Sequence, residues 1–370
     1  MNNKKGIFSD AVDHALIIYV VLASICGIAA INSATASMDG HYKFVIVQSA
    51  AFLLGMAAMT ALTFFNYSYL YKLRFVFFAI AVAMLVLVLV MGVVRGGTKG
   101  WIQLGPVNLQ PAEIAKICFI ITISSHLSRV KEKINKPKTL LFLFLHLGVY
   151  MALVLMQPDF GTAMVFAVIF CVCLFFAGIS LKYVFGAVGA LVVASPLVWL
   201  LLNPIQRNRI LSFLDPESDP MGTGYHVLQS KLAIGSGQIL GRGYLRGPQT
   251  QYGYLPERQT DFIFSSIGEE FGFIGCLIVT LLLFSIIFRC FKDAGDSDHD
   301  PFGMFICVGV GAMMFFHTLE NIGMCVGILP ITGIPLPFIS YGGSSMLTCC
   351  AAIGLVQSVV TRRRRTKFDI

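Results

Sequence analysis

Apolar runs of about 18 or more residues recur along this 370-residue chain, and one long polar stretch interrupts them. Runs of that length cross the roughly 30 Å hydrocarbon core of a bilayer as helices. Charged residues make up only 12% of the chain and hydrophobic residues 56%, whereas a soluble domain carries about 25% charged residues. A β-barrel would instead show short alternating segments. The sequence therefore predicts an all-α polytopic integral membrane protein with a single membrane domain over residues 1–370.

Ten transmembrane helices are predicted, seven before the polar stretch, within residues 1–202, and three after it, within residues 262–360. The stretch itself, residues 203–261, is predicted to be one large extracytoplasmic loop between helices 7 and 8. Residues 361–370 are predicted to form a basic cytoplasmic tail. The predicted spans are 15–36, 45–65, 75–94, 110–127, 140–156, 162–178, 183–202, 262–289, 302–327 and 339–360.

Lys and Arg residues predict the orientation of these spans. They gather in the short loops on the side of the N-terminus and in the run Arg362–Arg365, and such loops stay in the cytoplasm. Both termini are therefore predicted to be cytoplasmic, with the large loop outside. No basic stripe is interleaved with aromatic residues, which argues against a nucleic-acid partner. Because ATP and nucleotide sugars are cytoplasmic, a donor used at the outer face must arrive already activated.

The large loop is far longer than a simple connection, which usually has about 4–6 residues. Long loops that are not of low complexity tend to carry function. Within this one, apolar residues from Tyr225 to Ile234 fall near helical spacing. They predict a short amphipathic helix able to lie on a membrane surface.

Asp261 stands where the loop meets the next apolar span, beside Glu257 and Arg258. Partial shielding by lipid raises the pKa of a carboxyl group toward the range of a general base, and a nearby arginine favours its ionised form. Asp261 is therefore a candidate catalytic residue. The alternative is an interfacial acid that only caps the span.

Charged groups within apolar spans are costly, so each one points to function or to a specific partner. Glu113 and Lys116 lie three residues apart in LQPAEIAK, on one helix face and within reach of an ion pair. They either fix helix packing or form a polar wall of a central cavity, and the two roles are compatible. Asp159 in QPDFGT either caps the following helix or binds a cation or a sugar hydroxyl at the outer surface.

Two further pairs favour structural roles. Glu269 and Glu270 follow about two turns into the eighth span, where one is expected to pair with a Lys or Arg across the bundle. His317 and Glu320 share one face of the ninth span. For them a polar contact is favoured, and a proton relay is the alternative.

The stretch Gly327–Gly343, GILPITGIPLPFISYGG, combines prolines and glycines with apolar residues. Irregular backbone among membrane spans is tolerated only where it lines a cavity or is buried in protein. A re-entrant or kinked segment is therefore predicted, lining a crevice near the outer leaflet beside Asp261. Ser340 and Gly342 are expected to face this crevice.

Several long motifs, in order, resemble those of the SEDS (shape, elongation, division and sporulation) proteins. They are QPAEIAK, QPDFGT, DPESDPMGTGYH, QSKLAIGSG, LPERQTDFIF, GEEFG and NIGMCVGILPITGIPLPFISYGGSS. The resemblance runs from about Gly97 to the C-terminus, which is most of the chain. TGIPLP and NIGM resemble the elongation branch of that family rather than its division branch.

The resemblance implies a peptidoglycan glycosyltransferase with ten transmembrane helices. Such a protein polymerises lipid II into glycan strands at the outer leaflet of the bacterial cytoplasmic membrane, during cell elongation and rod-shape maintenance. The family's essential aspartate matches Asp261, which would act as general base with undecaprenyl diphosphate as the leaving group. Its buried Glu–Lys pair matches Glu113 and Lys116, and its QPD aspartate matches Asp159.

Cationic groups around the large loop are expected to stabilise the departing diphosphate; they are Arg207, Arg209, Lys231 and Arg258. The sequence requires no cofactor, but a divalent cation, Mg²⁺ or Mn²⁺, near Asp159 would serve the same purpose. The implied partners are lipid II, the nascent glycan strand, a class B penicillin-binding transpeptidase and other membrane proteins of the elongation complex.

Two positions depart from the family pattern. Gln259 stands where the family usually has a histidine before Thr-Asp, so that histidine is not expected to be indispensable acid–base machinery. Gly100 stands where an arginine often precedes the tryptophan of the third outer segment, and Lys99 is expected to supply that charge.

Two other functions remain open. A lipid II flippase would depend most on the deep charges Glu113, Lys116 and Glu320, and Asp261 would be dispensable. A non-catalytic scaffold for a cell-wall synthase would tolerate every polar substitution that preserves packing. The large outward loop and the interfacial aspartate favour the enzyme over both.

Overall fold

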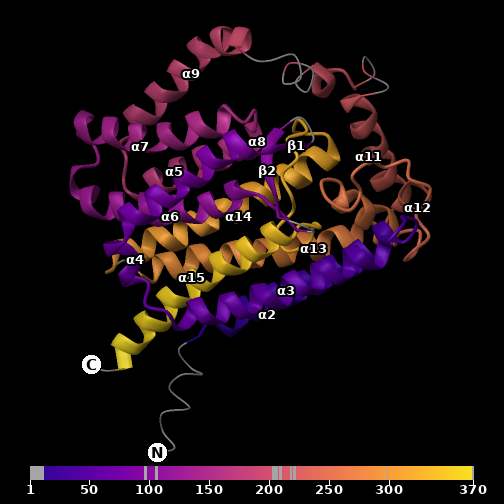
Figure 1. Cartoon of the computed structure of the whole chain (residues 1–370), viewed down its shortest axis with the longest axis horizontal. Helices are drawn as coiled ribbons and strands as arrows, with labels where there is room; N and C mark the ends of the chain where they lie inside the picture. Colours follow the sequence, from indigo (N-terminus) through magenta and orange to yellow (C-terminus); the bar gives the residue numbers. More distant parts are fainter. Residues whose placement is uncertain are drawn as a thin grey trace, which may run out of the picture.

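The computed structural model describes residues 12–95, 98–104, 107–201, 207, 211–216, 219, 222–297 and 299–368. Long helices dominate this part of the chain (Figure 1). The helices are α2 His14–Thr35, α3 His41–Phe64, α4 Ser68–Lys72, α5 Arg74–Met91, α6 Pro111–Val130, α7 Pro137–Leu155, α8 Phe160–Phe176, α9 Leu181–Leu201, α11 Thr223–Gly237, α12 Pro248–Gln251, α13 Ile263–Gly295, α14 Pro301–Val326 and α15 Gly343–Phe368, with a 3₁₀ turn at Lys131–Lys133.

Seven helices in the described part of the chain are long and apolar enough to cross a membrane. They are α2, α3, α5, α7, α13, α14 and the Gly343–Arg363 portion of α15. Helix α8 and the Leu181–Pro196 portion of α9 are apolar but shorter. The chain is therefore a multi-pass, mainly helical membrane protein, as its apolar runs predict.

Local sequence explains where several helices begin. The carboxylate of Asp13 accepts hydrogen bonds from the backbone N–H groups of Ala15 and Leu16 and so caps α2. Asp300 caps α14 in the same way, through the N–H of Phe302. Proline occupies the first turn of α6, α7, α12 and α14, where its missing N–H costs no helical hydrogen bond.

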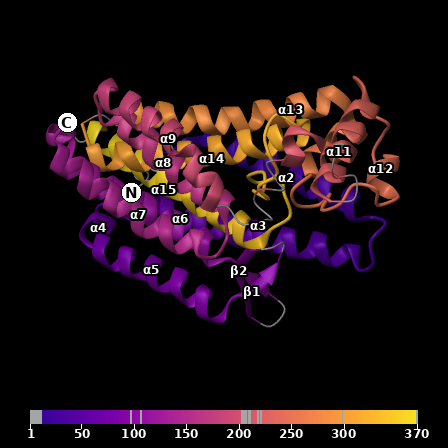
Figure 2. The same ribbon diagram turned by 90° about the horizontal axis from the view of Figure 1, so that it is seen from above.

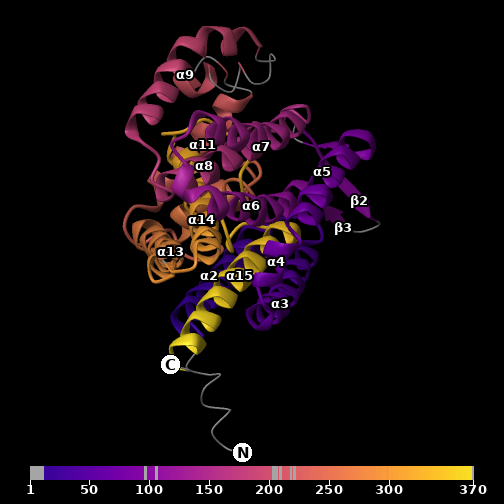
Figure 3. The same cartoon turned by 90° about the vertical axis from the view of Figure 1, so that its left-hand side faces the viewer.

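Helix α14 lies at the centre of the bundle. Of an apolar 18-residue stretch within this helix, 89% is buried in the protein. It packs against α13, α8 and α6, while α15 packs against α3; Figure 3 shows α14 between α8 and α13. Helix α9 stands apart from these helices in Figures 1 and 3. Its apolar side chains, including Phe185, Val193 and Leu200, are exposed, which is typical of a surface that contacts lipid.

A small antiparallel sheet departs from the all-α prediction. Strands β1 (Val93–Arg95), β2 (Thr98–Leu104) and β3 (Val107–Leu109) pair in that order, with Ile102 opposite Leu109. The sheet lies beyond the end of α5 (Figure 2). The third span was predicted to run to residue 94, but α5 ends at Met91 because the next residues pair as a strand. Apolar content could not separate these short strands from the end of a span.

The predicted amphipathic helix of the large loop is present as α11, but it lies on protein. It packs against α13 and α14, and Figure 2 shows α11 and α12 beside the start of α13. Val227 and Ala233 are buried in this contact. The expectation of a helix resting on the membrane surface is therefore wrong for its buried face, whereas Leu232 remains exposed.

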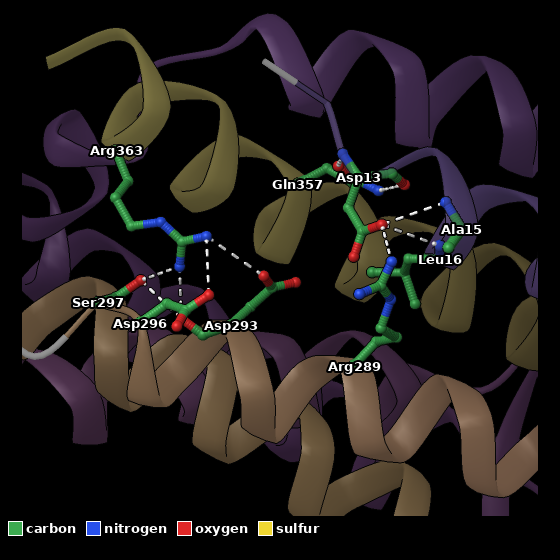
Figure 4. Close-up of polar contacts among 9 residues, drawn as sticks. All are labelled: Asp13, Ala15, Leu16, Arg289, Asp293, Asp296, Ser297, Gln357 and Arg363. Carbon is green, nitrogen blue, oxygen red and sulfur yellow. Dashed lines mark hydrogen bonds and ion pairs between the residues drawn. The ribbon is translucent and has the colours of Figure 1, made fainter. Parts of the chain in front are cut away.

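Polar contacts tie three helices together at one end of the bundle (Figure 4). Arg289 of α13 donates to the Asp13 carboxylate over 2.9 Å. Gln357 of α15 donates to the Asp13 carbonyl and accepts from its N–H, at 2.8 and 3.0 Å. Arg363 of α15 pairs with Asp293 at 3.5 Å, near the end of α13. These contacts join the start of α2 to the ends of α13 and α15.

Helix α13 contains a break at Gly272, where φ is 65° and ψ is −161°, a conformation essentially confined to glycine. The break exposes backbone N–H groups that the loop then satisfies: Phe273 donates to the Gln238 carbonyl and Ile274 to that of Ile239. A Cβ at Gly272 would lie 2.4 Å from the Gly241 nitrogen. The glycine therefore allows the large loop to dock against α13.

Replacing Gly272 by alanine is expected to destabilise the protein by at least about 1–3 kcal/mol, because the new Cβ clashes with backbone and the conformation is strained. Thermal unfolding in detergent measures this loss. Gly148→Ala is the control, since a Cβ at this helical glycine meets nothing within 4 Å and is expected to stabilise by about 0.5–1 kcal/mol. Equal effects of the two substitutions would contradict this account of the break.

Candidate functional site

Asp261 lies two residues before α13 begins, at the junction predicted from the sequence. It is partly exposed, between the buried residues Arg258 and Phe262. Its carboxylate oxygen Oδ2 lies 3.4 Å from the position that a Cβ would occupy at Gly333. Gly333 is exposed and has a φ of +77°. The carboxylate therefore faces the irregular segment 327–342 at the surface of the protein.

Three consecutive carbonyls of the loop that carries Asp261 accept hydrogen bonds from this segment or from α14. The donors are Tyr341 N to Gln259 (2.9 Å), Ser340 Oγ to Thr260 (2.7 Å) and Asn321 Nδ2 to Asp261 (2.9 Å). Such a run leaves the loop little freedom to move away from the segment. The position of Asp261 is therefore set by backbone contacts made by residues far apart in the sequence.

Ser340 and Gly342 serve the fold of the segment itself. The Ser340 hydroxyl accepts from the N–H of Leu336 over 2.8 Å while it donates to Thr260, and the residue is buried. Gln48 of α3, fully buried, donates to the Ser340 carbonyl and accepts from Gly342 N–H, both over 3.1 Å. Ser340 was predicted to face a crevice, but its hydroxyl is occupied in holding backbone.

Glu113 and Lys116 form the buried ion pair that their spacing predicts, at 2.8 Å. The Lys116 ammonium also donates to Nε2 of His317 over 3.1 Å. Because Nε2 must then accept, the proton of a neutral His317 ring resides on Nδ1, which lies 3.3 Å from the Pro335 carbonyl. The ion pair of α6 is thus connected through His317 to segment 327–342.

One face of α14 presents three polar side chains to this segment, at the i, i+3, i+4 spacing that brings helical residues together. His317 reaches the Pro335 carbonyl, and Glu320 accepts from the Thr332 hydroxyl over 2.9 Å. Asn321 donates to the Ile334 carbonyl over 2.9 Å. The predicted polar contact of His317 and Glu320 is thus made with the segment.

Asp159 caps α8. Its carboxylate accepts from the Thr162 N–H over 2.9 Å and from the Thr162 hydroxyl over 2.8 Å. It lies near Gly100, whose Cβ, if present, would be 4.0 Å from Asp159 Oδ2. The ammonium of Lys99, next to Gly100, donates to the Leu89 carbonyl at the end of α5 over 2.6 Å. That Lys99 replaces the charge of the family's arginine stays a prediction.

Two of the cationic candidates are occupied in structural contacts. Arg258 is buried and donates to the Thr250 carbonyl and, over 2.8 Å, to the Ser37 hydroxyl. Burial lowers the pKa of its guanidinium below the usual value. Arg207 donates to the carbonyls of Trp199 and Leu200 at the end of α9. Both side chains therefore donate to main-chain carbonyls.

Lys231 is the exposed cation of the candidate set on α11. Its Nζ lies 2.6 Å from the position of a Cβ at Gly327, so its side chain crosses the end of α14. Ser230 fastens α11 there, because its hydroxyl donates to the Cys325 carbonyl over 2.6 Å. Lys231 is thus held on the side of α14 from which the segment 327–342 departs. Arg209, the remaining candidate, lies outside the described residues.

Glu269 and Glu270 anchor the loop, and among the described residues neither forms an ion pair with a Lys or Arg across the bundle. Glu269 accepts hydrogen bonds from the N–H groups of Gln249 and Thr250, at 2.7 and 2.8 Å, and from the Thr250 hydroxyl. Glu270 accepts from the Ser33 hydroxyl over 2.6 Å. The Glu269 carboxylate thus satisfies N–H groups in the first turn of α12, and Arg258 donates to the Thr250 carbonyl of the same helix.

Within the described ranges, no three His, Cys, Asp or Glu side chains gather as a set of metal ligands. Mg²⁺ is nevertheless often held by one or two carboxylates together with substrate phosphates. The Asp159 carboxylate is a ligand of the type used in that second arrangement, but it is buried and both of its oxygens accept hydrogen bonds from Thr162.

Gln48 and Asn321 were not predicted from the sequence to belong to the site. The signal was present, because an uncharged amide within an apolar helix must find a hydrogen-bonding partner. Both turn out to hold backbone of the segment 327–342.

These features define a class: a multi-pass membrane protein that holds an aspartate at one end of its bundle by a network of buried polar side chains. Residues 13–365 match the family named for FtsW, RodA and SpoVE, described as cell cycle protein. The chain belongs to this family, and the resemblance to the SEDS proteins is thereby confirmed.

The names of relatives that are similar to this chain agree with its membership of the family. The chain is 40% identical over 276 residues to the peptidoglycan glycosyltransferase MrdB of Escherichia coli K12, covering 74% of each chain. It is 31% identical to the peptidoglycan glycosyltransferase RodA of Treponema pallidum, covering 95% of this chain and 98% of that one. A solved structure of a peptidoglycan synthase complex that coordinates polymerisation and crosslinking superposes with a TM-score of 0.81 at 31% identity, covering 95% and 98%.

Replacing Lys116 by methionine is expected to destabilise the protein by about 3–5 kcal/mol, because Glu113 is left as an unpaired buried charge. The double variant Glu113→Gln/Lys116→Met is expected to lose less than the sum of the single variants. Thermal unfolding of the three variants in detergent measures both effects. Strict additivity would contradict the pairing seen here.

Proposed function

We propose that this chain is a peptidoglycan glycosyltransferase that polymerises lipid II into glycan strands during cell elongation. The observation that carries the proposal is Asp261, a partly exposed carboxylate held beside the segment 327–342 by contacts to consecutive backbone carbonyls. Membership of the family and the names of the relatives support the same activity. A carboxylate that is fixed yet accessible is what a general base requires.

The proposed reaction is one displacement. The Asp261 carboxylate accepts the proton of the sugar 4-hydroxyl of an acceptor lipid II. The hydroxyl oxygen attacks the anomeric carbon of the growing glycan, and the bond from that carbon to undecaprenyl diphosphate breaks. The electron pair leaves with the diphosphate, so no nucleotide is needed. A single displacement inverts the anomeric configuration.

The departing diphosphate needs cationic groups around it. Among the candidates, Lys231 is proposed for this role, because it is exposed and crosses the end of α14 beside the segment 327–342. Arg207 and Arg258 are already engaged with carbonyls. A divalent cation held by Asp159 and by the diphosphate would neutralise the same charge.

The proposed topology has ten spans. The seven long apolar helices are joined by α6, α8 and α9, which would complete the crossing pattern. Both termini then lie in the cytoplasm, and the large loop with Asp261 lies outside the cytoplasmic membrane of a bacterium. This orientation follows from the distribution of Lys and Arg. It places the carboxylate at the leaflet where lipid-linked donors are available.

The proposed partners include a class B penicillin-binding transpeptidase, which would crosslink the strands made here. The similarity to a solved synthase complex that coordinates polymerisation and crosslinking supports this pairing. Other membrane proteins of the elongation complex are proposed as further partners.

A flippase or a scaffold is supported less well. The deep charges on which a flippase would depend are engaged with neighbours: Lys116 contacts Glu113 and His317, and Glu320 accepts from Thr332. Such contacts suit a fixed bundle. A scaffold would not need a partly exposed carboxylate in so constrained a loop.

Replacing Asp261 by asparagine or alanine is expected to lower glycan polymerisation by about 10²–10⁴-fold, because the general base is lost. The measurement uses purified lipid II and protein co-purified with its transpeptidase. Asp39→Asn is the control, since this exposed carboxylate lies in the connection between α2 and α3. The proposal fails if the Asp261 variants polymerise at the native rate.

Chelation of divalent cations by EDTA is expected to lower polymerisation by the native protein, and added Mg²⁺ or Mn²⁺ to restore it. Asp159→Asn is expected to need more cation for half-maximal activity, whereas Asp39→Asn keeps the native requirement. Activity that is insensitive to EDTA would remove the cation from the proposal.

A further inference from the structure

Asn321 makes the most direct side-chain contact with the backbone of Asp261. It lies on α14 and is fully buried. Its Nδ2 donates to the Asp261 carbonyl and to the Ile334 carbonyl, each over 2.9 Å. Both partners are acceptors, so the orientation of the amide is unambiguous: a side-chain oxygen in that position would face two carbonyl oxygens.

The two carbonyls belong to the two segments that meet at the site. Asp261 ends the large loop, and Ile334 lies in segment 327–342 next to Gly333, which the Asp261 carboxylate faces. A single amide therefore fixes the residue that carries the carboxylate and the backbone opposite it. Phe262 and Ile263, which follow Asp261, are buried.

We propose that Asn321 is a positioning residue for Asp261, which keeps the carboxylate in place for proton abstraction without touching the substrate. The inference rests on the proposed function. A merely structural amide would stabilise the bundle equally well but would have no selective effect on turnover. A displacement of about 1 Å at a reacting group can cost about 10²-fold in rate.

The chain offers a matched control at the other end of the bundle. The side chain of Gln357 is also a fully buried amide. It accepts from the N–H of Asp13 and donates to the carbonyl of the same residue. Within the described part of the chain, the hydrogen bonds of its side chain both go to Asp13. Removing either amide leaves buried backbone groups unsatisfied, so both losses are expected to lower thermal stability.

The test compares kcat and KM for lipid II in native protein, Asn321→Ala and Gln357→Ala, each with its transpeptidase partner. Asn321→Ala is expected to lower kcat by about 10²-fold with KM unchanged, whereas Gln357→Ala keeps the native kcat. The inference is overturned if both variants lose kcat equally, or if the effect of Asn321→Ala lies in KM.

A second variant covers the possibility that alanine prevents folding. Asn321→Gln keeps both donors on a side chain one methylene longer, so it is expected to fold and to give an intermediate kcat. A native kcat in this variant would contradict a positioning role, because the displaced amide could not hold Asp261 in the same place.

Hydrogen exchange separates failure of this inference from failure of the proposed function. Backbone exchange within residues 257–262 and 332–336 is expected to rise in Asn321→Ala but not in Gln357→Ala. If the native protein makes no glycan, the proposed function is wrong, and exchange alone then decides whether Asn321 fixes these segments. Unchanged exchange in Asn321→Ala overturns the inference in either case.

Discussion

The site depends on hydrogen bonds from buried side chains to the irregular backbone of segment 327–342. The part of this segment that is buried among apolar helices has no water to satisfy its backbone, so protein groups must do so. Asn321 and His317 bind its Ile334 and Pro335 carbonyls, and Gln48 binds it from α3. Once held, the segment holds the loop of Asp261 in turn. The accessible carboxylate is thus supported by interior contacts that no substrate reaches.

The buried ion pair belongs to the same network of contacts. Glu113 and Lys116 alone would stabilise little, since desolvation offsets much of the attraction of a buried pair. Through His317, however, the Lys116 ammonium selects the ring tautomer that faces the Pro335 carbonyl. One chain of contacts therefore runs from the ion pair of α6 to the segment 327–342.

Sequence reasoning predicted the features that depend on composition and local spacing. Apolar length predicted the long helices, and the i, i+3 spacing predicted the Glu113–Lys116 pair. It could not predict that Arg258 and Ser340 would bind carbonyls, because their partners Thr250 and Thr260 are identified only by the tertiary fold. The strands after Met91 were missed for a similar reason, since short apolar runs do not distinguish strand from helix.

The proposed position of the Asp261 carboxylate at one face of the membrane can be tested directly in sealed vesicles that contain uniformly oriented protein. Lipid II is supplied only in the leaflet on the side of Asp261, or only in the opposite leaflet, and polymer is measured without nucleotide. Polymer is predicted in the first case alone. Polymer or transbilayer movement of lipid II from the opposite leaflet would contradict the account and favour a flippase.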